Sequence, residues 1–272
     1  MLPELHPDST APIWRIGYFN TSRYCWMGCA FCDFAKPLPN VALAEVPPGL
    51  NLDLVNQALD FGAVDRLKLH GGLSMREPFD YWIHLIRQIK GRTLKPLTAF
   101  SPVEIWQYHV REHRSLRDLL GLLKWAGADA LGPGGSETFD IELRRAWSPY
   151  RMTPDQWLQV AEAAEQTGLP YHVGLMVMPR MPLAAVEAHL SALRHLRPAA
   201  WELKPFRSEK TALAVQGDAH LLEIADVVEH VRHSLSEAVI HVRLDAPRPD
   251  AAQILHAAGA SAMLVPVWEV SP

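Results

Sequence analysis

Residues 14–32 read WRIGYFNTSRYCWMGCAFC and contain all three cysteines of the chain. The apolar and aromatic run Trp14–Thr21 predicts a β-strand. Cys25, Cys29 and Cys32 follow it with the spacing C-x3-C-x2-C, and the aromatic Phe31 precedes the last cysteine. Three thiolates this close suit an iron–sulfur cube in which one iron lacks a protein ligand. An open iron is a place for chemistry, so this segment constrains function more than any other.

Other uses of three cysteines fit this pattern less well. A disulfide leaves one thiol unpaired, and we find no leader with a charged start and an apolar run that would indicate an oxidising compartment. A structural zinc site needs a fourth ligand, and neither His6 nor His70 lies at finger or ribbon spacing. The cysteine count excludes a closed four-cysteine cluster. Zinc and inert thiols remain the alternatives to an open cluster.

Length and charge narrow the classes of protein to which the chain can belong. Its 272 residues suffice for one sizeable barrel or one large α/β domain. The formal net charge of −4 argues against a nucleic-acid partner, which would call for a basic patch. No apolar run reaches the roughly 18 residues that a membrane span needs. We therefore expect a cytoplasmic, reducing location and no membrane partner.

Apolar, β-rich runs alternate with amphipathic helical stretches along the chain. The predicted strands are Trp14–Thr21, Arg66–His70, Lys95–Ser101, Ala128–Gly132, Tyr171–Val177, Ala200–Phe206, Ala238–Asp245 and Ala262–Val267. Helices such as Tyr81–Lys90 and Pro154–Thr167 show the 3.6-residue period. This alternation predicts an α/β fold with a parallel sheet.

The number of strands predicts a (βα)8 TIM-type barrel, or a partial barrel of six units plus an appendage. We expect an N-terminal arm over residues 1–13 and one barrel domain over residues 14–272. Active sites of such barrels lie at the C-terminal ends of the strands. Because the cysteines follow the first strand directly, they should lie at the mouth of the barrel and face its pore.

The cysteine motif resembles the signature of the radical S-adenosylmethionine (SAM) enzymes. The resemblance implies that Cys25, Cys29 and Cys32 hold a [4Fe–4S] cluster. It also implies that the amino and carboxylate groups of SAM chelate the fourth iron, and that the reduced cluster cleaves SAM to methionine and a 5′-deoxyadenosyl radical. The implied partner is a reducing electron donor such as flavodoxin or ferredoxin.

Two glycine-rich loops are expected to hold SAM. In the family, a glycine pair at the position of Gly71-Gly72 contacts the amino group of the methionine moiety, although two glycines also allow close packing for steric reasons alone. A second loop follows the fourth predicted strand and precedes a predicted helix start. It suits the ribose hydroxyls or the ammonium of SAM, or it is a plain turn and helix cap. Its candidate residues are Gly134, Gly135, Ser136 and Glu137.

Polar residues near the ends of the other strands are candidates for substrate binding. Ser101 and Glu104, after the third strand, suit a ribose or substrate contact, or form a capping box. On later strands, polar residues share the face that should meet the pore. These residues are His172, Glu202, Lys204, His241, Arg243 and Asp245.

These polar side chains divide into two expected roles. Arg243 is the preferred partner for a substrate carboxylate, because guanidinium can bind it bidentately, and Lys204 and Asp245 are further substrate contacts. Glu202, His172 and His241 could move a proton. Ordinary internal salt bridges are the alternative for each residue, since buried charges are costly unless paired.

Longer segments within residues 14–180 resemble enzymes of the futalosine route to menaquinone and their deazaflavin-pathway relatives. Residues 97–105 and Phe139–Arg144 look most like aminofutalosine synthase, and the cyclising enzyme of the route is next. The resemblance implies a transferase: the radical adds to the vinyl carbon of 3-[(1-carboxyvinyl)oxy]benzoate, the adduct rearranges, and bicarbonate is lost, which gives 6-amino-6-deoxyfutalosine. SAM is then a co-substrate.

Three alternatives to this reading stay open. They are dehypoxanthine futalosine cyclase, a shortened paralogue acting on another small anionic substrate, and an iron–sulfur carrier or sensor without turnover.

Overall fold

The computed structural model describes residues 11–34, 48–60, 63–74, 76–209, 211–213 and 216–272. Seven parallel strands form one sheet in the order β3-β2-β1-β7-β6-β5-β4. The strands are β1 (Ile13–Asn20), β2 (Arg66–His70), β3 (Leu97–Ala99), β4 (His172–Val177), β5 (Ala200–Pro205), β6 (Ile240–Arg243) and β7 (Ala262–Val270). The predicted arm lies mostly outside the described residues.

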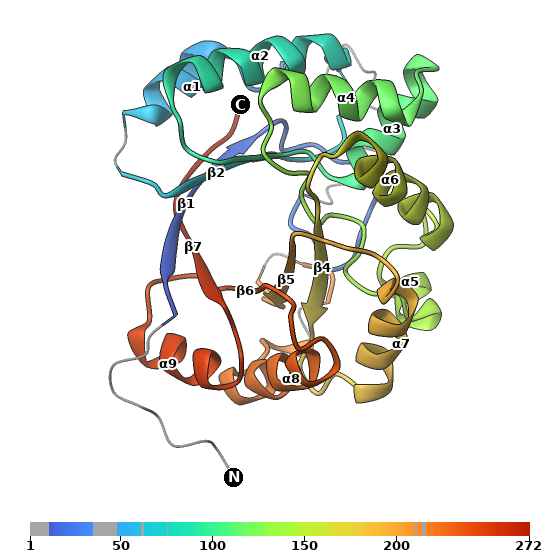
Figure 1. Cartoon of the computed structure of the whole chain (residues 1–272), viewed down its shortest axis with the longest axis vertical. Coiled ribbons are helices and arrows are strands. Elements are labelled where there is room, and N and C mark those ends of the chain that lie inside the picture. The colour runs from blue at the N-terminus through green and yellow to red at the C-terminus, as the bar shows by residue number, and fades with distance from the viewer. Residues whose placement is uncertain (1–10, 35–47, 61–62, 75, 210, 214–215) are drawn as a thin grey trace.

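The fourth predicted strand, Ala128–Gly132, forms only two isolated parallel bridges, so its prediction as a full strand was wrong. Thr98 bridges to Ala130, and Leu131 bridges to Tyr171. The segment is short because Gly127, in the left-handed region with φ 102°, ends the preceding helix, and Pro133, which lacks an N–H, follows. The two bridges still connect β3 to β4, which are the edges of the sheet. Seven parallel strands and this short segment therefore curl into a ring (Figure 1), which confirms a TIM-type barrel in a partial form, with one of the eight predicted strands reduced to two bridges.

The helices lie outside this ring. They are α1 (Leu52–Leu59), α2 (Phe79–Arg92), α3 (Pro102–Glu112), α4 (Leu116–Ala126), α5 (Ile141–Trp147), α6 (Pro154–Thr167), α7 (Leu183–Leu193), α8 (Leu221–Ser234) and α9 (Pro249–Ala257). In Figure 1, α1 to α4 cover one side of the ring, and α8 and α9 cover the opposite side. No described helix combines the length and the apolar character needed to cross a membrane.

Local sequence signals explain the helix bounds. The helix α6 begins with a capping box between Thr153 and Gln156 and ends at Gly168, whose φ of 63° is in the left-handed region. Both helices predicted from periodicity are confirmed, with α2 extending two residues further at each end. Apolar residues that alternate along the strands, such as Leu67 and Leu69, are fully buried in the main core.

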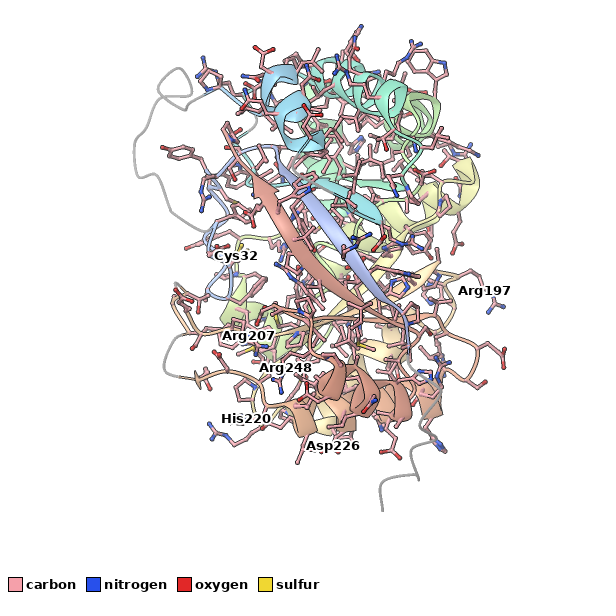
Figure 2. The ribbon with its side chains drawn as sticks, turned by 90° about the vertical axis from the view of Figure 1, so that its left-hand side faces the viewer. Cys32, Arg197, Arg207, His220, Asp226 and Arg248 are labelled. Carbon is pink, nitrogen blue, oxygen red and sulfur yellow. The ribbon has the colours of Figure 1, made fainter. Side chains whose placement is uncertain are left out.

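Because all strands are parallel, their C-terminal ends lie at one end of the barrel. The cysteine segment follows β1 at this end. Figure 2 shows Cys32 and Arg207, which follow β1 and β5, toward the same end, and Arg197, which precedes β5, toward the other end. The mouth of the barrel is thus built from the segments that follow the strands, as expected.

Candidate functional site

The cysteine segment is attached to the end of β2 by backbone contacts. Thr21 N–H donates to the His70 carbonyl over 2.9 Å, and Gly72 N–H donates to the Ser22 carbonyl over 2.7 Å. A Cβ on Gly72 would lie 2.2 Å from the Tyr24 carbonyl oxygen, and one on Gly71 would lie 2.5 Å from Thr21 Oγ1. The glycine pair is therefore required for the close approach of the two segments.

The three cysteines line one small cavity of about 60 Å³, which we call the cysteine cavity. Gly71, Ser101, Glu104 and Arg151 also line it. Cys29 is buried, and Cys25 and Cys32 are half-buried. Burial raises the pKa of the Cys29 thiol and raises that of Cys32 to about 12. Since ligands must be deprotonated, cluster binding here would release protons.

The geometry of the cysteine cavity fits a cube. Among the described residues, no three His, Cys, Asp or Glu side chains converge as ligands of one metal ion. A [4Fe–4S] cube does not need such convergence, because each thiolate binds its own iron. Three thiols around a shared space, with a cation beside them, meet that requirement.

A larger cavity of about 240 Å³, the central cavity, adjoins the cysteine cavity and shares Cys32, Gly71, Ser101, Glu104 and Arg151 with it. It continues to the glycine-rich loop and to the later strands. The predicted site residues that line it are Gly71, Ser101, Glu104, Gly134, Glu137, Lys204 and Arg243. Candidates from five separate segments thus meet in one space.

The other candidates from the glycine-rich loops support the walls of this cavity. Ser136 is fully buried; its hydroxyl donates to the Pro133 carbonyl and accepts from Gly174 N–H, each over 2.7 Å. Gly135 has a φ of 96° and donates its N–H to Glu137 Oε2 over 3.1 Å. Gly72, Gly135 and Ser136 do not line either cavity.

Two arginines that the sequence analysis missed organise the loop that ends in Glu137. Arg151 Nη1 donates to Glu137 Oε2 over 2.7 Å. Arg144 is buried and donates to the carbonyls of Gly135, Thr138 and Met152. Burial is the largest single influence on Glu137 and opposes its ionisation, but the cations of Arg151, Lys204 and Arg144 and a backbone hydrogen bond together lower the pKa of this carboxyl. Arg151 lies within residues 14–180, the stretch that carries the resemblance, and that stretch was the signal available for it.

Ser101 and Glu104 form a hydrogen bond of their own. Ser101 Oγ donates to Glu104 Oε2 over 2.7 Å, and the Ser101 side chain makes no cap bond to α3, so the capping-box alternative was wrong. Burial raises the pKa of Glu104 to about 8. Its Oε1 is buried and has no hydrogen-bond partner in the described part of the chain. A neutral acid with a free oxygen suits a hydroxyl or an ammonium of a ligand.

Polar side chains also form the floor below the central cavity. Lys68 of β2 and Glu202 of β5 lie on opposite sides of the ring, and Lys68 Nζ donates to Glu202 Oε2 over 2.5 Å across it. His172 Nδ1 lies 2.7 Å from Glu202 Oε1. Burial opposes the charge of Glu202, but Lys68 and His172 hold the pKa of this carboxyl well below its usual value.

The three predicted proton-transfer residues therefore lie below the cavity. Glu202, His172 and His241 line neither the cysteine cavity nor the central cavity, whereas Lys68 does line the central one. His241 packs edge-on against Trp14 at 4.9 Å, and neither ring nitrogen has a partner among the described residues. Burial lowers the pKa of His241 to about 4, so it is neutral.

An outer chamber of about 530 Å³ adjoins the central cavity and shares Phe31, Met176, Lys204 and Arg243 with it. Phe206 adds a further apolar wall. Lys204 and Arg243 form no hydrogen bond or ion pair with a carboxylate in the described residues, and the Arg243 guanidinium lies 5.2 Å from the Tyr18 ring. Burial lowers the pKa of Lys204.

Asp245 differs from its prediction. The strand β6 ends at Arg243, so strand alternation no longer sets the direction of Asp245. This carboxylate is exposed, pairs with Arg207 and lines the outer chamber but not the central cavity. It therefore belongs to the rim of the mouth rather than to the pore.

The sequence profile of the radical SAM superfamily matches residues 19–193, which include the cysteine segment, the glycine pair and Glu137. The chain belongs to the radical SAM superfamily. This superfamily consists of enzymes that use SAM and a [4Fe–4S] cluster. The three cysteines that line the cysteine cavity lie within the matched residues.

Individual relatives are distant. The chain is 27% identical over 151 residues to cyclic dehypoxanthine futalosine synthase of Halalkalibacterium halodurans, covering 55% of this chain and 40% of that protein. It is 26% identical over 180 residues to aminodeoxyfutalosine synthase of Thermus thermophilus, covering 65% of this chain and 47% of that protein. The matches span less than half of these relatives. The crystal structure of methylornithine synthase (PylB) superposes with a TM-score of 0.70 at 18% identity, covering 93% of this chain and 72% of that one, and shows the same fold.

Proposed function

We propose that this protein is an aminofutalosine synthase that joins the 5′-deoxyadenosyl group of SAM to 3-[(1-carboxyvinyl)oxy]benzoate. A cluster in the cysteine cavity, reduced by a flavodoxin or ferredoxin, would supply the electron that cleaves SAM. Cys25, Cys29 and Cys32 would hold this cluster. The remaining work of the chain is to bind two ligands next to each other and to keep water away from them.

Side chains between the two cavities are suited to SAM. Gly71, Glu104 and Arg151 line both cavities, and Glu137 lines the central one. The neutral acid of Glu104 and the carboxylate of Glu137 can accept hydrogen bonds from ribose hydroxyls or an ammonium. A ligand held by these groups would extend from the cysteine cavity into the central cavity.

The observation that supports the substrate assignment is the pair of cations that faces the outer chamber. Lys204 and Arg243 line both the chamber and the central cavity, and no described carboxylate forms an ion pair with either. Charge-assisted hydrogen bonds to two carboxylates would satisfy them. The walls formed by Phe31, Met176 and Phe206 suit the aromatic ring between those carboxylates.

The cyclising enzyme is the second candidate, because one of the relatives carries that activity in its name. Its substrate bears a single benzoate carboxylate and would leave one of the two cations without an anionic partner. The dicarboxylate therefore matches the pair of Lys204 and Arg243 better.

The test is anaerobic reconstitution, reduction with dithionite, and addition of SAM with each candidate substrate, followed by mass spectrometry. We expect aminofutalosine and methionine from the enolpyruvyl benzoate. Turnover of dehypoxanthine futalosine alone would establish the cyclase instead. Only 5′-deoxyadenosine with both compounds would point to another substrate, and a bound cluster without SAM cleavage would point to a carrier or sensor.

Arg243→Met tests the role of the chamber. Losing a charged hydrogen bond of about 1.5–3 kcal/mol should raise KM for the enolpyruvyl benzoate by about 10- to 100-fold. Slow SAM cleavage without substrate should persist, because Arg243 does not line the cysteine cavity. Arg248→Met is the matched control, since Arg248 is exposed and pairs with Asp250. Equal loss of both activities in Arg243→Met would refute a role confined to the substrate.

A further inference from the structure

Arg151 is the one cation that lines both the cysteine cavity and the central cavity among the described residues. Its side chain is only 12% exposed, and Nη1 donates to Glu137. The guanidinium lies 5.5 Å from the ring of Phe31, the residue just before Cys32. Arg151 therefore lies between the cysteines and Glu137, the carboxylate that we propose accepts hydrogen bonds from SAM.

One donor of this guanidinium is unused. Nε of Arg151 is buried and has no hydrogen-bond partner among the described residues. Buried donors nearly always have a partner, so an unpaired one calls for an explanation. A sulfur atom of a cluster in the adjoining cysteine cavity would supply the acceptor that Nε lacks.

The guanidinium also stays charged in this position. Burial lowers the pKa of Arg151, but Glu137 and the thiol groups of all three cysteines act against this, and the net shift is upward.

We propose that Arg151 raises the reduction potential of the cluster held by the three cysteines, and that Glu137 limits this effect by pairing with the guanidinium. Reduction adds one electron to the cluster and breaks no bond. A nearby cation stabilises the more negative reduced state, and it does so strongly where water is excluded. Hydrogen bonds to cluster sulfurs act in the same direction. A carboxylate at the same place has the reverse effect.

This proposal rests on the proposed function only in requiring a cluster in the cysteine cavity, and it makes a prediction of sign. Arg151→Met removes the cation and should shift the midpoint potential to more negative values. Glu137→Gln removes the opposing charge and should shift it to more positive values. General damage to the site would not shift the midpoint potentials of the two variants in opposite directions. Arg151→Lys keeps the charge and should remain closer to the unaltered protein than Arg151→Met.

The experiment is an anaerobic redox titration of the reconstituted full chain, followed by the EPR signal of the reduced cluster, without SAM or substrate. Iron and sulfide content is measured for every variant. Arg145→Met is the control, because Arg145 is six residues away, 72% exposed and paired with Glu142. It should leave the potential unchanged.

Opposite shifts in Arg151→Met and Glu137→Gln support the proposal. Shifts in the same direction, or an unchanged potential in Arg151→Met at full cluster content, overturn it. If Arg151→Met fails to hold a cluster, Glu137→Gln decides: an unchanged or more negative potential is then the overturning result. Because no substrate is present, failure of the substrate assignment does not affect this outcome.

Discussion

Lys68→Met should destabilise the protein more than Lys68→Met combined with Glu202→Gln. Lys68 and Glu202 are 11% and 3% exposed, and their charged atoms lie 2.5 Å apart across the barrel. Breaking a buried pair by removing one partner costs roughly 3–5 kcal/mol, because the other charge stays buried without compensation. In Lys68→Met the Glu202 carboxylate keeps its contact with His172, so we expect a loss at the lower end of this range, about 3 kcal/mol.

The other two variants complete a double-mutant cycle. Glu202→Gln leaves the Lys68 ammonium unpaired, and we expect a loss of about 4–5 kcal/mol in the free energy of unfolding. In the double variant neither charge of the pair remains, and the new amide oxygen at position 202 can accept from His172 in place of the carboxylate. The loss should then fall to about 1–2 kcal/mol, as for one net hydrogen bond.

Urea unfolding of the cluster-free protein, followed by circular dichroism, measures all four corners of this cycle. Additive losses within about 0.5 kcal/mol would show that the two residues do not interact and would falsify the argument.

The pH dependence of the free energy of unfolding gives a second test of this ion pair. The folded pKa of Glu202 is lowered, so its stabilisation is present above the ordinary pKa of 4.5 and is lost as pH falls through the folded value. Removing Lys68 should raise that folded pKa, so the cost of Lys68→Met should shrink between pH 7 and pH 5.

Two further substitutions test other parts of the molecule. Gly72→Ala would place a Cβ 2.2 Å from the Tyr24 carbonyl oxygen and should lower the iron and sulfide content after reconstitution; Gly121→Ala, which meets nothing within 4 Å, should not. His189→Phe should remove a source of acid sensitivity. Burial lowers the pKa of His189 from 6.5 to about 3, so its contribution is present above pH 6.5 and is lost as pH falls toward 3. Between pH 7 and pH 5 the free energy of unfolding, measured with urea, should fall by about 2 kcal/mol more in the unaltered protein than in this variant. Equal falls would contradict a lowered pKa of His189.

The ring and its mouth could be predicted because they follow from local patterns. Runs of β-rich residues alternate with amphipathic helices, and parallel strands bring their C-terminal ends together. The cysteine segment, Gly71 and Glu137 were therefore predicted to meet before any contact between them was known. The fourth strand was overpredicted because its apolar composition does not show how short the paired segment is between Gly127, which ends the preceding helix, and Pro133.

The depth of a side chain in the barrel could not be predicted. Strand periodicity gives the face of a residue but not its layer, so Glu202, His172 and His241 were placed on the correct face yet lie below the cavity. Lys68 was overlooked, although it alternates with Arg66 and His70 in the strand that had been predicted. Its partner Glu202 is 134 residues away in sequence, and only the closed ring brings the two together.

Glu202 in the polar floor of the barrel helps to explain why Lys204 and Arg243 stay charged without an ion-pair partner. Lys204 is stabilised in its charged form by Glu137 and Glu202, and Glu202 also acts on Arg243, yet none of these carboxylates forms an ion pair with either cation. Balancing charges from a distance leaves the donors of both side chains unused. Under the proposed function, Glu202 would thus support substrate binding through its charge while it holds Lys68 and His172 in place. Weaker substrate binding in a Glu202 variant would follow from these two effects alone, and it would not identify Glu202 as a proton-transfer residue.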